Sequence, residues 1–209
     1  VVALRTALRG EVDEAMALLS SVQPEWRGRM QQLSVGFEAG RVAESTKALQ
    51  ALAVEYPDVP IVQAELTRRL VDQNRVLDAL PAARQSYRLL PGIGQLLYLA
   101  HALIVSGASD EAAALLREVP SPDARIAGLL AQAIEGSQLL EALSLWATYL
   151  DAYPLDWRSQ LRLINLMAHA NRLDMARERA WTIVENNPLL APPGLFFEAA
   201  VLQDAFGSD

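Results

Sequence analysis

The sequence contains no cysteine, and this absence excludes three kinds of chemistry. A chain without thiols has no disulfide framework, no thiolate nucleophile and no zinc site that uses cysteine. Lysine is nearly absent too, because Lys47 is the only lysine among the 18 basic residues. Since a preference for arginine is typical of a GC-rich genome, we expect a bacterial protein, located in the periplasm or the cytoplasm.

Long apolar segments are also missing. The longest, LLYLAHALIV at Leu96–Val105, has ten residues, whereas a helix that spans a bilayer needs about 20. We therefore expect a buried helix here and no direct insertion into a membrane. The net charge of -7 argues against nucleic acid and anionic membrane surfaces as partners, because both bind basic patches.

Sequence motifs of catalysis and cofactor binding are absent as well. The chain has no GxxxxGK phosphate loop, no GxSxG nucleophile elbow and no HExxH zinc motif. Its two histidines, His101 and His169, lie in different repeats and form no local metal pair. The acidic runs at residues 12–14 and 109–111 fall where helices are expected to begin, so they complement the helix dipole. We therefore expect no enzyme, no metal site and no cofactor.

What the sequence does contain is a large aliphatic fraction with helical spacing. Hydrophobic residues make up 52% of the chain but aromatic residues only 6%, which is typical of an all-α protein with an Ala- and Leu-rich core. In LLYLAHALIVSG, for example, Leu96, Leu99 and Leu103 recur on one helical face. Trp146 and Trp181 fall within similar patterns, so we expect both in the core.

The chain also repeats itself. GEVDEAMALLSSV at residues 10–22 returns 97 residues later as GASDEAAALLREV. The glycines that open these two segments belong to a series of turn residues at intervals of 30, 34, 33, 30 and 34 residues. The series is Gly10, Gly40, Asn74, Gly107, Ser137 and Asn171. A small residue follows five positions after each turn, and a proline follows seventeen positions after four of them. Each repeat is therefore expected to be a pair of helices, because Gly, Asn or Ser ends one helix and proline ends the other.

This spacing resembles the tetratricopeptide repeat, a helix-turn-helix unit of about 34 residues. The resemblance covers nearly the whole chain. Aliphatic residues replace most of the family's first-helix Trp, Gly and Tyr, which leaves related helical-repeat families open. The resemblance implies an all-α, right-handed solenoid of stacked antiparallel helix pairs, with about six repeats in one domain over residues 1–209. Since the chain opens without a methionine, we expect a piece of a longer protein.

The turn residues lie 0, 30 and 64 positions after Gly10 and again 0, 30 and 64 positions after Gly107. This favours duplication of a three-repeat block over convergence on one consensus. Other residues also match at an offset of 97: Glu38 with Glu135, Tyr56 with Tyr153, Gln63 with Gln160, and Arg75 with Arg172. One conflict is Pro81, which falls inside a predicted second helix and is expected to kink it.

In tetratricopeptide arrays the first helices line a concave groove, and the resemblance implies which side chains point into it. The residues assigned to partner binding are Arg27, Phe37, Arg68, Tyr98, His101, Arg158, Arg162, Asn165 and His169. The last four recur at steps of four, three and four, so they share one helical face. Ordinary solvated arginines would account for the same pattern. The family's clamp of Lys, Asn and Arg is not reproduced, so chaperone C-terminal tails are not favoured as ligands.

The resemblance implies a protein-protein interaction scaffold that holds a segment of a partner protein. Guanidinium groups on the shared face would favour an acidic or backbone-exposing segment. The alternative is a repeat arm of a larger protein, either in bacterial exopolysaccharide export or outer-membrane assembly, or as the regulatory arm of an enzyme. The last expected helix has an apolar face that favours self-association and carries Phe196, Phe197, Leu202 and Phe206.

Overall fold

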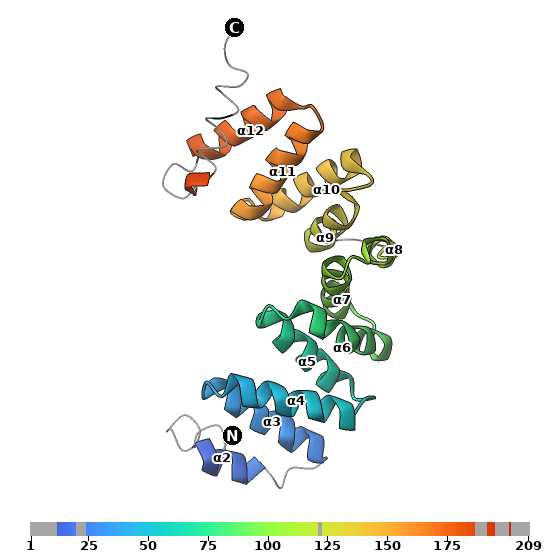
Figure 1. The fold of residues 1–209 in the computed structure, drawn as a ribbon, viewed down its shortest axis with the longest axis vertical. Helices are drawn as coiled ribbons and strands as arrows, with labels where there is room; N and C mark the ends of the chain where they lie inside the picture. The colour runs from blue at the N-terminus through green and yellow to red at the C-terminus, as the bar shows by residue number, and fades with distance from the viewer. Residues whose placement is uncertain (1–11, 20–23, 121–122, 187–191, 195–200, 202–209) are drawn as a thin grey trace. The chain divides into compact units, whose positions relative to one another are not determined.

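The computed structural model describes residues 12–19, 24–120, 123–186, 192–194 and 201, and in this part of the chain it contains eleven α-helices and no strand (Figure 1). The all-α class expected from composition is confirmed. None of the described helices is long and apolar enough to cross a membrane. The helices are α2 (Val12–Leu19), α3 (Glu25–Glu38), α4 (Val42–Glu55), α5 (Pro60–Asp72), α6 (Val76–Leu89), α7 (Ile93–Val105), α8 (Ser109–Arg117), α9 (Ala124–Ile134), α10 (Leu139–Ala152), α11 (Trp157–His169) and α12 (Leu173–Asn186).

The chain divides after Gly107 into two compact halves, Val1–Gly107 and Ala108–Asp209. The N-terminal half contains α2–α7, and the C-terminal half contains α8–α12. Within each half, helices that follow one another in the chain pack side by side, as α5 does with α6 and α9 with α10 (Figure 1). Packing between chain neighbours is the arrangement of a helical repeat array. A single solenoid over residues 1–209 stays a prediction.

The helices of the two halves share one register at an offset of 97 residues. Helices α10 and α11 begin and end 97 residues after α4 and α5, and α12 begins 97 residues after α6. The residues that end α4 and α10 are Tyr56 and Tyr153, with φ of -122° and -126° and ψ of 65° and 61°. Both duplication of a block and convergence on one consensus would give this agreement in helix ends and residue type, so duplication stays a prediction.

Four of the predicted turn residues adopt the left-handed conformation that ends a helix. Gly40 and Gly107 have φ of +78° and +85°, and Asn74 and Asn171 have φ of +58° and +57°. After three of these turns the next N–H reaches back across the helix end, which satisfies a carbonyl of the last turn: Arg41 to Gly36, Arg75 to Leu70 and Arg172 to Met167.

The fifth described turn is built differently. Here the N–H groups of Ser137 and Gln138 both donate to the carbonyl of Ile134.

The small residues that follow each turn lie where paired helices approach closely. Ser45, Ala79, Ala112, Ala142 and Ala176 are all buried. At the α3–α4 contact, a Cβ added to Gly36 would lie 2.5 Å from the Ser45 hydroxyl. The repeat of small residues therefore marks helix-helix contacts, as the sequence predicts.

Three further expectations have different outcomes. Trp146 is 5% exposed and belongs to the core, but Trp181 is 36% exposed, so the prediction that it is buried is wrong. Pro81 lies inside α6, which runs as one helix from Val76 to Leu89, and the expected kink stays a prediction. The expected apolar C-terminal helix, with Phe196, Phe197, Leu202 and Phe206, lies outside the described residues.

Candidate functional site

The predicted binding residues belong to two separate sets, one in each half. In the N-terminal half they lie on three helices, α3, α5 and α7: Arg27, Phe37, Arg68, Tyr98 and His101. In the C-terminal half they all lie on α11: Arg158, Arg162, Asn165 and His169. Each set is considered by itself.

In the N-terminal half, the arginine predicted on α5 is already engaged within the fold. The Arg68 guanidinium contacts Glu65 at 2.5 Å and Asp72 at 3.2 Å. Arg69, which the sequence does not single out, also contacts Glu65 and places its guanidinium 4.0 Å from the centre of the Phe37 ring. Phe37 therefore meets a cation from the neighbouring first helix of its own half.

This cluster holds Glu65 in its charged form. Burial raises the pKa of the Glu65 carboxyl, but hydrogen bonds from Arg68 and Arg69 outweigh burial and lower the pKa below its ordinary value. The charges of Arg68, Arg69, Glu65 and Asp72 on α5 are already paired with one another. This part of α5 therefore has little unpaired charge to offer a partner. The exposed Arg27 lies at the start of α3 and places its guanidinium 5.2 Å from the Trp26 ring.

The two predicted residues on α7 are partly buried. Tyr98 lines a cavity of about 100 Å³ with Thr67 and Ser86, whose buried hydroxyl has no hydrogen-bond partner among the described residues. His101 is half-buried, and burial lowers its pKa. Both side chains therefore contribute to packing within the repeat as well as to its surface.

In the C-terminal half, α11 separates its core from its polar residues. Its buried residues, which pack towards α10 and α12, are Gln160, Leu163, Ile164 and Met167. On the opposite side, Arg158, Asn165 and His169 are exposed, as their spacing predicts. The Nδ1 atom of His169 lies 2.6 Å from the backbone oxygen of Asn165. We call the row of Arg158, Arg162, Asn165 and His169 the α11 face.

Arg162 differs from the other members of the α11 face. Its guanidinium forms a two-bond pair with Glu135, through Nε to Oε2 at 2.7 Å and through Nη2 to Oε1. It also lies 5.7 Å from the centre of the Trp146 ring. The hypothesis that this fork is open to a partner's carboxylate therefore needs correction, because an internal carboxylate already occupies it.

The first turn of α11 is fixed by a network around Asp156. Its carboxylate accepts hydrogen bonds from the Tyr149 hydroxyl at 2.8 Å, from the Ser159 hydroxyl at 2.8 Å and from the Ser159 N–H at 3.3 Å. Burial and the bond to Asp156 raise the pKa of Tyr149 to about 12, so the phenol stays a donor. This cap fixes the start of the helix that carries Arg158.

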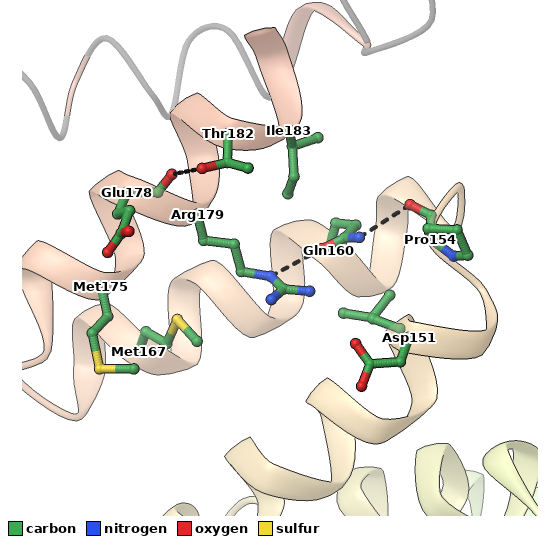
Figure 2. Close-up of a pocket in the computed structure, with 10 residues that line it drawn as sticks. Asp151, Pro154, Gln160, Met167, Met175, Glu178, Arg179, Thr182 and Ile183 are labelled. Carbon is green, nitrogen blue, oxygen red and sulfur yellow. Dashed lines mark hydrogen bonds between the residues drawn. The ribbon is translucent and has the colours of Figure 1, made fainter. Parts of the chain in front are cut away.

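A pocket that sequence reasoning did not predict lies among α10, α11 and α12 (Figure 2). Its volume is about 500 Å³. Its lining residues are Leu150, Asp151, Pro154, Gln160, Met167, Met175, Glu178, Arg179, Thr182 and Ile183. The signal that could have revealed it is the 97-residue register, in which Ala82 of α6 corresponds to Arg179 of α12.

Metal binding finds no support in the described part of the chain, which contains no group of three or more His, Asp or Glu residues that could hold an ion.

No family model matches the sequence, and no curated protein matches it. Solved structures do match the fold. MamA from Desulfovibrio magneticus RS-1, residues 41 to the end, aligns with 79% of this chain and 96% of its own, with a TM-score of 0.68 and 16% identity. A tetratricopeptide repeat protein from Parabacteroides merdae aligns with 97% of this chain and 83% of its own, with a TM-score of 0.69 and 12% identity.

A third structure, YrrB, is described as a tetratricopeptide repeat protein with an unusual peptide-binding site. It aligns with 77% of this chain and 84% of its own, with a TM-score of 0.57 and 15% identity. The chain therefore has the fold of tetratricopeptide repeat proteins, and the resemblance inferred from its spacing is confirmed at the level of the fold.

Proposed function

We propose that this protein is an interaction scaffold that binds a segment of a partner protein on the exposed side of its first helices, with the α11 face as the main contact. The observation that supports this most directly is the state of the Arg158 side chain, which is exposed and unpaired within the described part of the chain. It is exposed beside the capped start of α11 and has no ion-pair partner among the described residues. The row from Arg158 through Asn165 to His169 offers donors and acceptors over three turns of helix.

The chemistry of this row favours an acidic or backbone-exposing segment. A guanidinium binds a carboxylate through charge-assisted hydrogen bonds, and an exposed amide such as that of Asn165 can pair with a peptide backbone. Arg162 contributes differently from Arg158. Its pairing with Glu135 holds its side chain in place, so it would border the site and would not bind the partner's carboxylate. No catalytic role is proposed.

The same surface would serve a repeat arm of a larger bacterial protein, in exopolysaccharide export, in outer-membrane assembly or beside an enzyme domain. In that case the partner would be recruited to the activity of the other domains. Both versions require the α11 face to make the contact, so the same variants test them.

The test compares two charge reversals that change the net charge equally. Arg158→Glu alters the α11 face, whereas Arg172→Glu alters an exposed arginine in the α11–α12 turn. Each protein is immobilised, partners are captured from a bacterial lysate, and the affinity of the captured proteins is then measured. A charge-assisted hydrogen bond contributes about 1.5–3 kcal/mol, so Arg158→Glu should weaken binding by about tenfold or more, while Arg172→Glu should not.

Both variants should keep the helical circular dichroism and the melting temperature of the parent protein. If Arg158→Glu captures the same proteins with unchanged affinity at low and moderate salt, the partner does not bind on the α11 face.

A further inference from the structure

The structure points to a second binding site, in the pocket among α10, α11 and α12. We propose that this pocket binds a partner segment through an acidic side chain that pairs with Arg179, with apolar neighbours of that side chain on the pocket floor. This site is separate from the α11 face, since it lies on the side of α11 that meets α10 and α12 (Figure 2).

The first observation concerns the surroundings of the Arg179 guanidinium. Its guanidinium is half-buried and projects from α12 towards α11, where Nε donates to Oε1 of Gln160 at 3.1 Å (Figure 2). It forms no ion pair within 4.0 Å among the described residues, although Asp151 is near enough to act on it electrostatically. Burial accordingly lowers its pKa. A guanidinium that is partly desolvated and paired only with a neutral amide is short of a carboxylate.

Comparison with the N-terminal half shows how the pocket arises. The position of Arg179 corresponds to Ala82, which is 6% exposed in α6. In that half, Gln85 of α6 donates to the backbone oxygen of Pro57 at 2.9 Å and so ties α6 to the turn between α4 and α5.

The corresponding tie is lost in the C-terminal half. Thr182 occupies the place of Gln85, and its hydroxyl donates to the backbone oxygen of Glu178 within α12. The oxygen of Pro154, which corresponds to Pro57, accepts instead from Nε2 of Gln160 at 3.0 Å. An arginine in place of a small residue and the absence of this tie are thus two differences between the halves at the position of the pocket.

The size and lining of the pocket fit a segment of chain. Its volume of about 500 Å³ lies within the usual range of ligand pockets, about 300–1,000 Å³. On α12 its lining extends from Met175 to Ile183, more than two turns of helix, and Leu150 and Met167 add apolar surface. Methionine side chains adapt to varied apolar partners. An acidic side chain would match Arg179, and its apolar neighbours would match the apolar part of the lining.

Two further carboxylates restrict what can bind. Asp151 and Glu178 also line the pocket, and both are exposed. Asp151 competes with a ligand's carboxylate for Arg179, and together the two would repel a second acidic residue. The pocket thus favours one acidic residue among uncharged ones, in contrast to a strongly acidic tail.

The experiment uses the full chain and defined synthetic peptides. The probes are fluorescent 12-residue peptides with blocked ends, each containing one Glu among Leu, Met, Ala and Ser in varied order, and a matched set with Gln in place of Glu. Fluorescence anisotropy should find Glu peptides that bind at least tenfold more tightly than their Gln counterparts. Arg179→Ala, which restores the residue of the N-terminal half, should remove this preference, whereas Arg88→Ala, at an exposed arginine of the N-terminal half, should preserve it.

One further variant sharpens the test. Asp151→Asn removes the competing carboxylate and should strengthen binding of the Glu peptides. The proposal is overturned if no Glu peptide binds better than its Gln counterpart, or if Arg179→Ala, folded by circular dichroism, binds them as the parent does. It is also overturned if the same Glu peptides bind only when they are made with a free C-terminus.

Discussion

At the scale of single residues, close packing between helices in this fold depends on glycine and other very small residues at the contacts. Gly128 in α9 is buried against Tyr149 of α10, and a Cβ added there would lie 2.7 Å from Cδ2 of the ring. The ring has little freedom to move, because its hydroxyl is bonded to Asp156 and its edge packs on Trp146 with 5.7 Å between ring centres.

We therefore expect Gly128→Ala to destabilise the protein by about 1–3 kcal/mol, the usual cost of overpacking a core. Urea unfolding followed by circular dichroism measures this change. Gly94 in α7 is the matched control, since a Cβ there meets nothing within 4 Å. Gly94→Ala should cost nothing and can gain about 0.5–1 kcal/mol, because alanine favours the helix. Equal effects of the two substitutions would rule out the contact with Tyr149.

His101 gives a prediction about pH. Burial lowers its pKa in the folded protein, so the unfolded chain takes up a proton at a higher pH than the folded chain does. Its contribution is therefore favourable at neutral pH and is lost as the pH falls below about 6.5. His101→Gln should reduce the loss of unfolding free energy between pH 7.5 and pH 5.5. Carboxylates with lowered pKa, such as Glu65, act only at more acidic pH. Identical pH profiles for both proteins would contradict this assignment.

At the scale of the helix, α11 is held in place by contacts that its own sequence does not reveal. The 3.6-residue period correctly separates its buried side from the α11 face. The partner of Arg162, however, is Glu135, which lies 27 residues earlier at the C-terminal end of α9. Helical periodicity assigns a face to each residue of one helix, but it contains no information about which side chain of a neighbouring helix is within reach.

The ion pair has a measurable consequence for the choice of variants. The side chains of Arg162 and Glu135 are 36% and 22% exposed, so solvent screening limits their coupling to about 0.5–1 kcal/mol. A double-mutant cycle with Arg162→Gln and Glu135→Gln measures this coupling. Arg162→Glu should destabilise further, because it sets two carboxylates side by side. A coupling energy of zero would show that Arg162 is free to serve a partner.

The turns between helices were the most predictable elements. Gly40, Asn74, Gly107 and Asn171 occupy left-handed positions that glycine and asparagine tolerate best, so residue type alone indicated four helix ends. Trp181 was predicted wrongly because a periodic pattern in α12 does not show which of its sides is covered. The pocket on α12 was missed because it depends on the difference between Ala82 and Arg179 in equivalent positions, not on a motif.

At the scale of the whole chain, three successive helices of each half, α4–α6 and α10–α12, share their boundaries at an offset of 97 residues. Each half has its own buried core, with Leu49, Leu66 and Leu70 in one and Trp146, Leu163 and Ile164 in the other. Since repeat arrays are stabilised mainly by contacts between neighbours, separation at Gly107 should leave both cores intact.

We expect the fragments 1–107 and 108–209, expressed separately, each to be helical and to unfold cooperatively. Circular dichroism and thermal unfolding test this directly, with the full chain as the reference. A fragment that is unfolded by itself would show that its core depends on the other half.

We propose that the partner of this chain binds along the first helices, at the α11 face. Photo-crosslinking tests it most directly, with a photoreactive amino acid placed at Arg158 or Asn165, and at Leu140 as the control. Leu140 is 64% exposed on α10, a second helix. We expect covalent adducts with the same partner from positions 158 and 165 and none from position 140. Adducts from position 140 alone, or equal adducts from all three, would contradict it.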